Sequence, residues 1–155
     1  MTEKLCVFIS YKREDQAAAE RLWQRLGEWG YDRWMDVKDI RSGITPGSST
    51  WIDSIHQGLK HSQVLIGLVT PKSLQSQNVK DEWYWAKESN RRILLLKLQD
   101  FDKEDMPPPF VATDYIDLTA DETKGMGKLQ HELSAAISDR ADFREAVTPA
   151  ETPAP

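Results

Sequence analysis

One carboxylate in this chain occupies a position that calls for a chemical explanation. Glu82 belongs to residues 76–86 (SQNVKDEWYWA), a segment that predicts a helix. At about 100° per residue, one side of this helix is formed by Val79, Trp83, Ala86 and Asn90. Glu82 falls at the margin of that apolar side, whereas Asp81 falls on the opposite, solvent side. A carboxylate turned toward a core costs free energy unless a partner or a task keeps it there. Glu82 is therefore the first candidate for a catalytic group.

Other common chemistries lack the residue spacing that they need. No G-x-G-x-x-G follows an apolar run and no G-x-x-x-x-G-K-[ST] occurs, which argues against a standard dinucleotide fold and against a P-loop. His56, His61 and His131 are scattered, so no metal site is predicted. No G-x-S-x-G elbow occurs, and Cys6 has no motif around it. What remains is carboxylate chemistry, together with cations and aromatic rings.

Composition and charge limit the class of protein. The 155 residues are enough for one domain with a full core. An apolar fraction of 39% and a charged fraction of 29% are typical of soluble globular domains. The net charge of −5 argues against a general nucleic-acid binder. A single cysteine excludes an internal disulfide, and neither a membrane-spanning stretch nor a signal peptide is predicted, so we expect a cytoplasmic protein.

Short apolar runs alternate with helical stretches along the chain. Apolar runs predict buried strands at residues 5–9, 64–69 and 93–96 and a weaker edge strand at 115–118. Helical spacing predicts helices at residues 18–29, 49–60, around Glu82 and at 128–139, with Gly30 as the stop signal of the first helix. Strands that alternate with helices predict an α/β fold in which a parallel sheet carries helices on both faces.

Three segments, taken in their order, resemble the sequence boxes of one family. Residues 8–15 (FISYKRED) resemble the first box of the TIR (Toll/interleukin-1 receptor) domain, and residues 34–43 resemble its second strand and BB loop. Residues 70–86 resemble the third box of bacterial TIR domains, in which the glutamate belongs to the NAD-cleaving members. The similarity covers about residues 4–138. It implies a flavodoxin-like three-layer sandwich, with a central parallel sheet of about five strands and helices on both faces.

Two segments depart from the family pattern. Residues 43–47 (GITPG) look about one residue longer and more rigid than the usual loop before the second helix, which puts the detailed substrate contacts of the loop in doubt. The fourth strand reads LLLKL where many members carry a proline after the apolar run, a difference of little consequence.

The resemblance implies that the chain cleaves NAD⁺ at the nicotinamide–ribose bond, with Glu82 as the catalytic residue. Nicotinamide leaves as a neutral molecule, so one carboxylate that stabilises the transition state or forms a transient ester is sufficient. NAD⁺ is then the substrate, and neither a cofactor nor a metal is expected. The plainer interpretation is that Glu82 is a solvated helix carboxylate or an ion-pair partner of a cation such as Arg92.

The remaining site candidates lie mostly where strands of the predicted sheet end, the usual binding edge of such sheets. The candidate substrate-binding residues are Tyr11, Lys12, Arg13, Trp34, Asp36, Lys38, Gly43, Ile44, Ser76 and Trp83. Lys12, Arg13, Lys38 and also Arg41 are cations that could receive the pyrophosphate, and Arg13 suits it best because of its fork geometry. Each could equally be part of an ordinary solvated surface.

The other candidates each keep a structural alternative. Trp34 could stack on a flat cation or belong to the core of the second strand. Asp36 could bond a ribose hydroxyl or brace the loop, and Gly43 most simply supplies a turn with φ > 0. Ser76 is a natural helix cap that could also touch the ribose, and Trp83 suits packing or an interface.

Two classes of function follow, with a third that fits less well. The first is an NAD⁺ nucleosidase that forms ADP-ribose or a cyclic isomer in bacterial antiphage or stress defence and is activated by self-association through its BB loop. The second is a non-catalytic TIR module that assembles signalling complexes through homotypic contacts. The third is a nucleoside deoxyribosyltransferase-like enzyme, which also uses a glutamate but fits the BB-loop pattern poorly.

The expected domain organisation is a TIR domain at residues 1–140, followed by residues 141–155 as a disordered tail rich in proline, threonine and alanine. Such a tail suggests a linker to a sensor or oligomerising domain beyond the C-terminal end of this chain. Neither a nucleic acid nor a membrane is expected as a partner.

Overall fold

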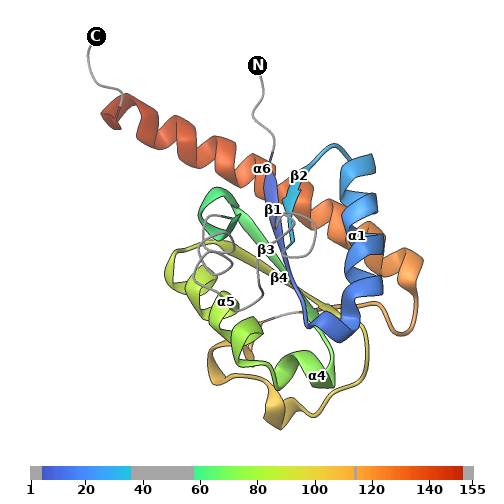
Figure 1. Ribbon diagram of the computed structural model, residues 1–155. Coiled ribbons are helices and arrows are strands. Elements are labelled where there is room, and N and C mark those ends of the chain that lie inside the picture. The colour runs from blue at the N-terminus through green and yellow to red at the C-terminus, as the bar shows by residue number, and fades with distance from the viewer. Residues whose placement is uncertain (1–4, 36–57, 114, 152–155) are drawn as a thin grey trace, which may run out of the picture.

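A single parallel sheet organises the part of the chain that the computed structural model describes, residues 5–35, 58–113 and 115–151. Its five strands lie in the order β2-β1-β3-β4-β5 (Figure 1). Their bounds are β1 Cys6–Ser10, β2 Asp32–Trp34, β3 Val64–Val69, β4 Arg92–Lys97 and β5 Tyr115–Asp117. Every neighbouring pair is parallel. The central strand β3 is buried throughout, as its uninterrupted apolar run predicts. The predicted α/β fold with about five parallel strands is confirmed.

The strand order reverses direction between β1 and β3. From β1 the chain moves outward to β2, whereas β3, β4 and β5 follow one another on the other side. In sheets of this order, the loops that leave the two central strands diverge to opposite faces and open a crevice at their carboxyl ends, where ligands bind. Ser10 at the end of β1 is paired with Gly67 of β3 beside this reversal. The topology therefore directs attention to the residues around Ser10.

Helices α1 (Gln16–Glu28) and α6 (Glu122–Glu151) cover one face of the sheet. A short 3₁₀ turn, η1 (Arg13–Asp15), precedes α1. The helical residues buried there are Ala19, Leu22, Leu26, Leu129, Leu133 and Ala136, and the strands contribute Val7, Ile9, Ile66, Leu68, Leu96 and Ile116. The repeat of apolar residues every three or four positions explains why each helix turns one stripe to the sheet.

Helices α4 (Pro71–Leu74) and α5 (Gln77–Glu88) cover the opposite face, with residues 58–61 and the 3₁₀ turns η2 (Lys103–Asp105) and η3 (Pro108–Phe110) beside them. This second cluster contains Phe8, Leu65, Val69, Leu74, Val79, Trp83, Ala86, Leu95, Met106 and Phe110. The two clusters on opposite faces make the three-layer sandwich that the sequence predicts (Figure 1).

Two helices end in the same way. Gly30 has φ 90° after α1, and Tyr31 N–H donates to Leu26 C=O at 3.0 Å, which closes a Schellman turn. Asn90 takes the same left-handed role after α5 with φ 58°, and Arg91 N–H donates to Ala86 C=O at 2.8 Å. The predicted stop at Gly30 is confirmed. Asn90 does not continue the apolar side of α5, because the helix ends at Glu88 and Asn90 is exposed.

Helix α6 is longer than the sequence predicts. It runs from Glu122 to Glu151, whereas helical spacing predicts only residues 128–139, and residues 141–151 are helical where a disordered tail is expected. The stretch 140–146 (RADFREA) is rich in strong helix formers, while the expectation of disorder rests on the proline and threonine content that follows it. In Figure 1 the last part of α6 extends beyond the edge of the sheet. None of the helices in the described ranges is both long and apolar enough to cross a membrane.

Candidate functional site

Glu82 lies in the middle of α5, on the flank of the stripe that packs against the sheet. Ser76 begins the helix, and its hydroxyl accepts a hydrogen bond from Val79 N–H at 3.3 Å. Val79 and Trp83 are buried, Glu82 is half-buried and Asp81 is exposed. The placement of Glu82 at the margin of an apolar face, and the capping role of Ser76, are as the sequence predicts.

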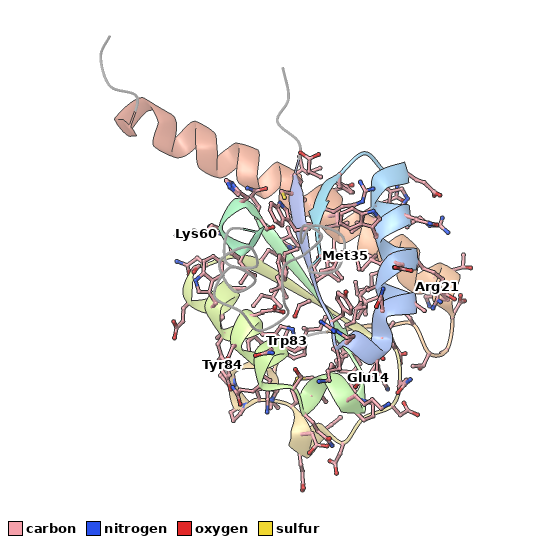
Figure 2. The ribbon with its side chains drawn as sticks, viewed as in Figure 1. Glu14, Arg21, Met35, Lys60, Trp83 and Tyr84 are labelled. Atoms are coloured by element: carbon pink, nitrogen blue, oxygen red, sulfur yellow. The ribbon has the colours of Figure 1, made fainter. Side chains whose placement is uncertain are left out.

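The Glu82 carboxylate contacts the end of β1 through a hydroxyl. Ser10 Oγ donates a hydrogen bond of 2.6 Å to Glu82 Oε1, and Trp83 Nε1–H donates one of 3.2 Å to Ser10 Oγ. Ser10 is only 1% exposed and Trp83 is fully buried. Figure 2 shows Trp83 between α5 and the strands. These three side chains connect the catalytic candidate on α5 to the strand end beside the crevice.

Ser10 belongs to the candidate site through these contacts and is not among the residues that the sequence predicts there. The sequence contains a signal for Ser10. Strand alternation places Ser10 on the same face as Phe8, where a small polar side chain lies against an apolar layer. A buried hydroxyl needs a partner, and in the structure that partner is the Glu82 carboxylate. The two residues are separated by 72 positions in the chain, so periodicity alone does not pair them.

Gly67 on β3 provides the space that the Trp83 ring occupies. A Cβ atom added at Gly67 would lie 2.8 Å from Trp83 Nε1 and 2.9 Å from Trp83 Cε2. A real Cβ does not approach ring atoms that closely, so any side chain at this position would displace the indole. Gly67 on β3 pairs with Ser10 on the neighbouring strand β1. The strand register therefore puts this space directly beside the Ser10 hydroxyl.

The three residues that follow β1 separate into different environments. Tyr11 is 7% exposed and its ring packs in the cluster with α1 and α6, across the sheet from Trp83. Lys12 is half-buried and Arg13 is exposed at the start of η1. The structure thus brings Lys12 and Arg13 to the carboxyl end of β1, as predicted, but turns the Tyr11 side chain toward the opposite face from Glu82.

A second hydrogen bond ties the carboxyl ends of the central strands together. Thr70, directly after β3, donates from Oγ1 to Asp15 Oδ2 at 2.7 Å, at the start of α1. The same hydroxyl oxygen accepts from Ser73 N–H at 3.1 Å, and Ser73 Oγ accepts from Thr70 N–H at 2.9 Å, which completes a capping box for α4. Thr70 therefore links the segment carrying Lys12 and Arg13 to the end of β3.

Trp34 packs beside the layer that contains Trp83. Its ring lies 6.5 Å from the His61 ring at an angle of 17°, a stacked arrangement. A Cβ atom added at Gly58 would lie 2.7 Å from Trp34 Cε3, so Gly58 lets the ring approach the chain closely. Trp34 is half-buried and pairs with Phe8 in the strand register. It is therefore a packing residue on the Glu82 face of the sheet, and its role toward a substrate stays a prediction.

The candidate residues on the loop after β2 lie in a part of the chain that the structure does not describe. Asp36, Lys38, Arg41, Gly43 and Ile44 lie outside the described residues, as do residues 49–57 of the predicted second helix. Residues 58–61 are helical, at the place where that helix is expected to end.

Arg92 contacts the carboxylate of Glu132 and not that of Glu82, for which the sequence offers it as an ion-pair partner. Its Nη2 lies 2.8 Å from Glu132 Oε2 on α6. Arg92 begins β4 and pairs with Val64, at the amino end of the sheet, whereas Glu82 contacts Ser10 at the carboxyl end of β1. An ion pair with Arg92 therefore does not explain the placement of Glu82.

A cavity of about 330 Å³ lies at the carboxyl edge on the α1 side of the sheet. Its polar lining residues are Glu14, Asp15, Arg21, Thr70, Gln99 and Glu122. Three of them are carboxylates and one is a cation, a balance that disfavours a pyrophosphate. Glu82 does not line this cavity. In the described ranges, no group of three or more histidine, cysteine or acidic residues is arranged to hold a metal ion.

Charged groups at the ends of β4 and β5 pair with one another. Lys97 Nζ lies 2.9 Å from Asp100 Oδ1 and 3.7 Å from Asp117 Oδ2. The hydrogen bond to Asp100 raises the pKa of the Lys97 ammonium above its ordinary value. The Thr119 hydroxyl, followed by the Thr119 backbone N–H, lowers the pKa of the Asp117 carboxyl. These charges lie at the carboxyl ends of β4 and β5, the second and third strands from β1 in the sheet order.

Comparison with solved structures places this architecture among known folds. The chain is similar to the TIR domain of the Toll-related receptor TRR-2 from Hydra magnipapillata, with 16% identity, a TM-score of 0.66, and coverage of 85% of this chain and 97% of that one. It is also similar to the TIR domains of the activated Roq1 resistosome, which directly recognises the pathogen effector XopQ, with 14% identity, a TM-score of 0.65, and coverage of 84% and 99%.

A more distant likeness is to an enzyme. The 2-deoxyribosyltransferase of Bacillus psychrosaccharolyticus shares 10% identity with a TM-score of 0.53, over 64% of this chain and 79% of that one. At these identities the solved structures establish the fold alone. A comparison with curated protein sequences finds no match.

A family model supplies the sequence-level link that the solved structures do not. The model, described as the TIR domain, matches residues 7–138. This range includes all five strands except Cys6, the first residue of β1, and it includes both Ser10 and Glu82. The chain therefore belongs to the TIR domain family.

Proposed function

We propose that this chain is a TIR-domain NAD⁺ nucleosidase that cleaves the nicotinamide–ribose bond, releasing nicotinamide together with ADP-ribose or a cyclic isomer of it. One observation carries the proposal. The half-buried Glu82 carboxylate accepts a 2.6 Å hydrogen bond from Ser10 at the carboxyl end of β1, beside the reversal of strand order where such sheets bind ligands. Fixed carboxylates at a binding edge are candidates for catalysis.

The chemistry requires only one such group. In NAD⁺ the nicotinamide is a pyridinium bonded to C1′ of the ribose. When the C1′–N bond breaks, its electron pair goes to the ring nitrogen, so nicotinamide leaves neutral and no acid has to protonate it. Positive charge then develops on the ribose, where Glu82 stabilises it or forms a transient ester. Water, or an adenine nitrogen in the cyclic product, then bonds to C1′, displaces Glu82 where an ester has formed, and releases one proton to the solvent. Ordinary glycoside hydrolysis needs a second carboxylate for its leaving group.

Cations at the end of β1 support binding of the dinucleotide. Lys12 is half-buried and Arg13 is exposed, and both follow Ser10 closely in the chain. An arginine fork suits the oxygens of a pyrophosphate. We therefore assign the pyrophosphate to Arg13 and Lys12, and we expect Lys38 of the following loop to assist. Tyr11 is left out of this assignment because its ring packs with α1 and α6.

We further propose that the activity serves defence signalling in the cytoplasm and depends on self-association through the BB loop. One structural relative, Roq1, is described in an activated resistosome that directly recognises a pathogen effector, which agrees with a defence role. If neighbouring copies complete the site, the activity per molecule rises with protein concentration. A scaffold that assembles without catalysis would show association and no turnover.

The test is to incubate the protein with NAD⁺ over a range of protein concentrations and to separate nicotinamide, ADP-ribose and cyclic products. We expect nicotinamide release that increases more steeply than protein concentration and that Glu82→Ala abolishes. Association without release at any concentration would favour the non-catalytic module. Transfer of deoxyribose between bases, with NAD⁺ left intact, would favour the deoxyribosyltransferase reaction to which the fold is distantly similar.

A further inference from the structure

We infer that Ser10, Trp83 and Gly67 form a positioning device that holds the Glu82 carboxylate for the reaction. The inference rests on the proposed function of Glu82 and assigns a part to three residues that do not themselves react. The device is a chain of two hydrogen bonds, from Trp83 Nε1 to Ser10 Oγ at 3.2 Å and from Ser10 Oγ to Glu82 Oε1 at 2.6 Å.

The direction of this chain is fixed by the chemistry of its first member. An indole N–H can only donate, so Ser10 must use an oxygen lone pair to accept from Trp83. The single hydroxyl hydrogen of Ser10 is then available for Glu82 Oε1. An ionised carboxylate is an acceptor only and completes the pattern. The chain of donors therefore presents a hydrogen to Glu82 Oε1, which the ionised carboxylate can accept while it stabilises a cationic ribose.

Burial makes this arrangement rigid. Ser10 is 1% exposed and Trp83 is fully buried, so water does not compete for the hydroxyl. Successive hydrogen bonds of this kind polarise one another and become stronger in a low-dielectric environment. The backbone of β1 fixes Ser10, and the packing of Trp83 against Phe110, with ring centroids 5.7 Å apart, fixes the indole. Ser10 and Trp83 are thus held in place by contacts that do not involve Glu82.

Gly67 completes the device because it leaves room for the indole at the strand surface. A methyl group at this position would lie 2.8 Å from Trp83 Nε1, the atom that donates to Ser10. The indole would have to move away from Ser10, since the strand backbone is paired on both sides and cannot yield. Gly67→Ala therefore acts on Glu82 through Trp83 and Ser10, without touching the carboxylate.

The first experiment measures NAD⁺ turnover by Ser10→Ala, Trp83→Phe and Gly67→Ala. We expect kcat to fall by about tenfold or more in each variant, while KM changes less than about twofold, because orientation rather than binding is lost. Ser10→Cys keeps a weak donor and should lie between Ser10→Ala and the unmodified chain. A matched control is Ser62→Ala, since Ser62 is 3% exposed and donates to Gly58 C=O at 2.7 Å, near the amino end of β3. Ser62→Ala should keep its kcat.

A double-mutant cycle separates positioning from general loss of stability. If Trp83 acts through Ser10, then Trp83→Phe should lower kcat much less in the Ser10→Ala background than alone. Rates are expressed per folded molecule, so a structural role alone leaves them unchanged. Unchanged kcat in Ser10→Ala, or full additivity of the two substitutions, would overturn the inference. Should Trp83→Phe fail to fold, Gly67→Ala takes its place in the cycle with Ser10→Ala, and Ser10→Cys still reports the dependence of kcat on the donor at position 10.

A spectroscopic measurement tests the device independently of turnover. In ¹H–¹⁵N spectra of the folded protein, Glu82→Gln should shift the Trp83 indole N–H resonance in the unmodified background and leave it nearly unmoved in Ser10→Ala. Equal shifts in both backgrounds would show that the indole does not sense Glu82 through Ser10, and would overturn the inference. Absence of NAD⁺ cleavage by the unmodified chain would overturn the proposed function instead, while the indole shifts would still decide the hydrogen-bonded chain.

Discussion

At the scale of single residues, the candidate site is organised by neutral side chains around the Glu82 carboxylate. Ser10 donates to Glu82, Trp83 donates to Ser10, and Gly67 leaves room for the ring. The sequence predicts Glu82 and the burial of Trp83, because helical spacing reports which face a residue occupies. It does not predict the part played by Ser10, because a contact across 72 residues depends on strand order, which periodicity does not encode. The sequence also does not predict that the Tyr11 side chain packs on the face opposite Glu82, because neighbouring residues of an extended chain point to opposite faces.

The pair formed by Asp117 and Thr119 gives a prediction at this scale. The Thr119 hydroxyl is the largest cause of the lowered pKa of Asp117. Thr119→Val should therefore raise the pKa of Asp117 toward its ordinary value, while the Thr119 backbone N–H, 2.8 Å from Asp117 Oδ1, keeps part of the effect. The measurement is an NMR titration of the Asp117 carboxyl carbon.

The sign of the associated pH effect follows from linkage. A carboxyl whose pKa is lower in the folded than in the unfolded state stabilises the fold above its unfolded pKa, and this contribution is lost as the pH falls through the folded pKa. Thr119→Val should thus lose less stability on acidification than the unmodified chain. An unchanged titration of Asp117 would show that the hydroxyl has no influence on it.

At the scale of elements, two side-chain hydrogen bonds connect the elements around the candidate site, one between β1 and α5 and one between the end of β3 and the start of α1. Strand β1 supplies Ser10 and α5 supplies Glu82, and Thr70 ties the end of β3 to Asp15 at the start of α1. Buried strands and amphipathic helices are predictable from the sequence because burial imposes a repeat on residue types. Short elements such as α4 and η1 are not, since each spans only three or four residues, and α4 depends on the side-chain cap formed by Thr70 and Ser73.

Thr70→Val tests the connection between β3 and α1. It removes the hydrogen bond to Asp15 and the side-chain cap of α4 in a residue that is 1% exposed. A lost cap and a lost buried hydrogen bond together predict a fall of about 2 kcal/mol in the free energy of unfolding, measured in urea. An exposed control, Gln77→Ala, which removes only the bond to Asp81, should change stability by less than about 0.5 kcal/mol. Equal stability of Thr70→Val and the unmodified chain would show that the connection is dispensable.

At the scale of the whole molecule, one sheet and two helical layers enclose two apolar clusters, one on each face of the sheet, in the part of the chain that the structure describes. The last buried side chains described on α6 are Leu133 and Ala136, and the helix continues to Glu151. The sequence predicts the layers, because alternating strands and helices allow few arrangements. It underestimates the length of α6. Residues 140–146 favour a helix, but the proline- and threonine-rich segment that follows them predicts disorder.

Truncation of the chain to residues 1–140 tests where the domain ends. Because the truncation spares Leu129, Leu133 and Ala136, Tm should change by less than about 4 °C in a calorimetric scan, equivalent to roughly 1 kcal/mol. As a control, Leu133→Ala in the full chain should cost about 2–5 kcal/mol, since this side chain is fully buried. A loss of stability in the truncated chain comparable to that of Leu133→Ala would place the domain boundary beyond residue 140.

The measurement that tests the central claim most directly compares nicotinamide release by Glu82→Gln and Asp81→Asn at equal folded concentration. The two residues are adjacent carboxylates on α5, one half-buried against Ser10 and the other exposed beside Gln77. Each substitution removes one charge and changes the side-chain shape little. We predict that Glu82→Gln lowers the rate by about a hundredfold or more, while Asp81→Asn retains it within about twofold. Equal rates in the two variants would contradict the assignment of Glu82 as the catalytic residue.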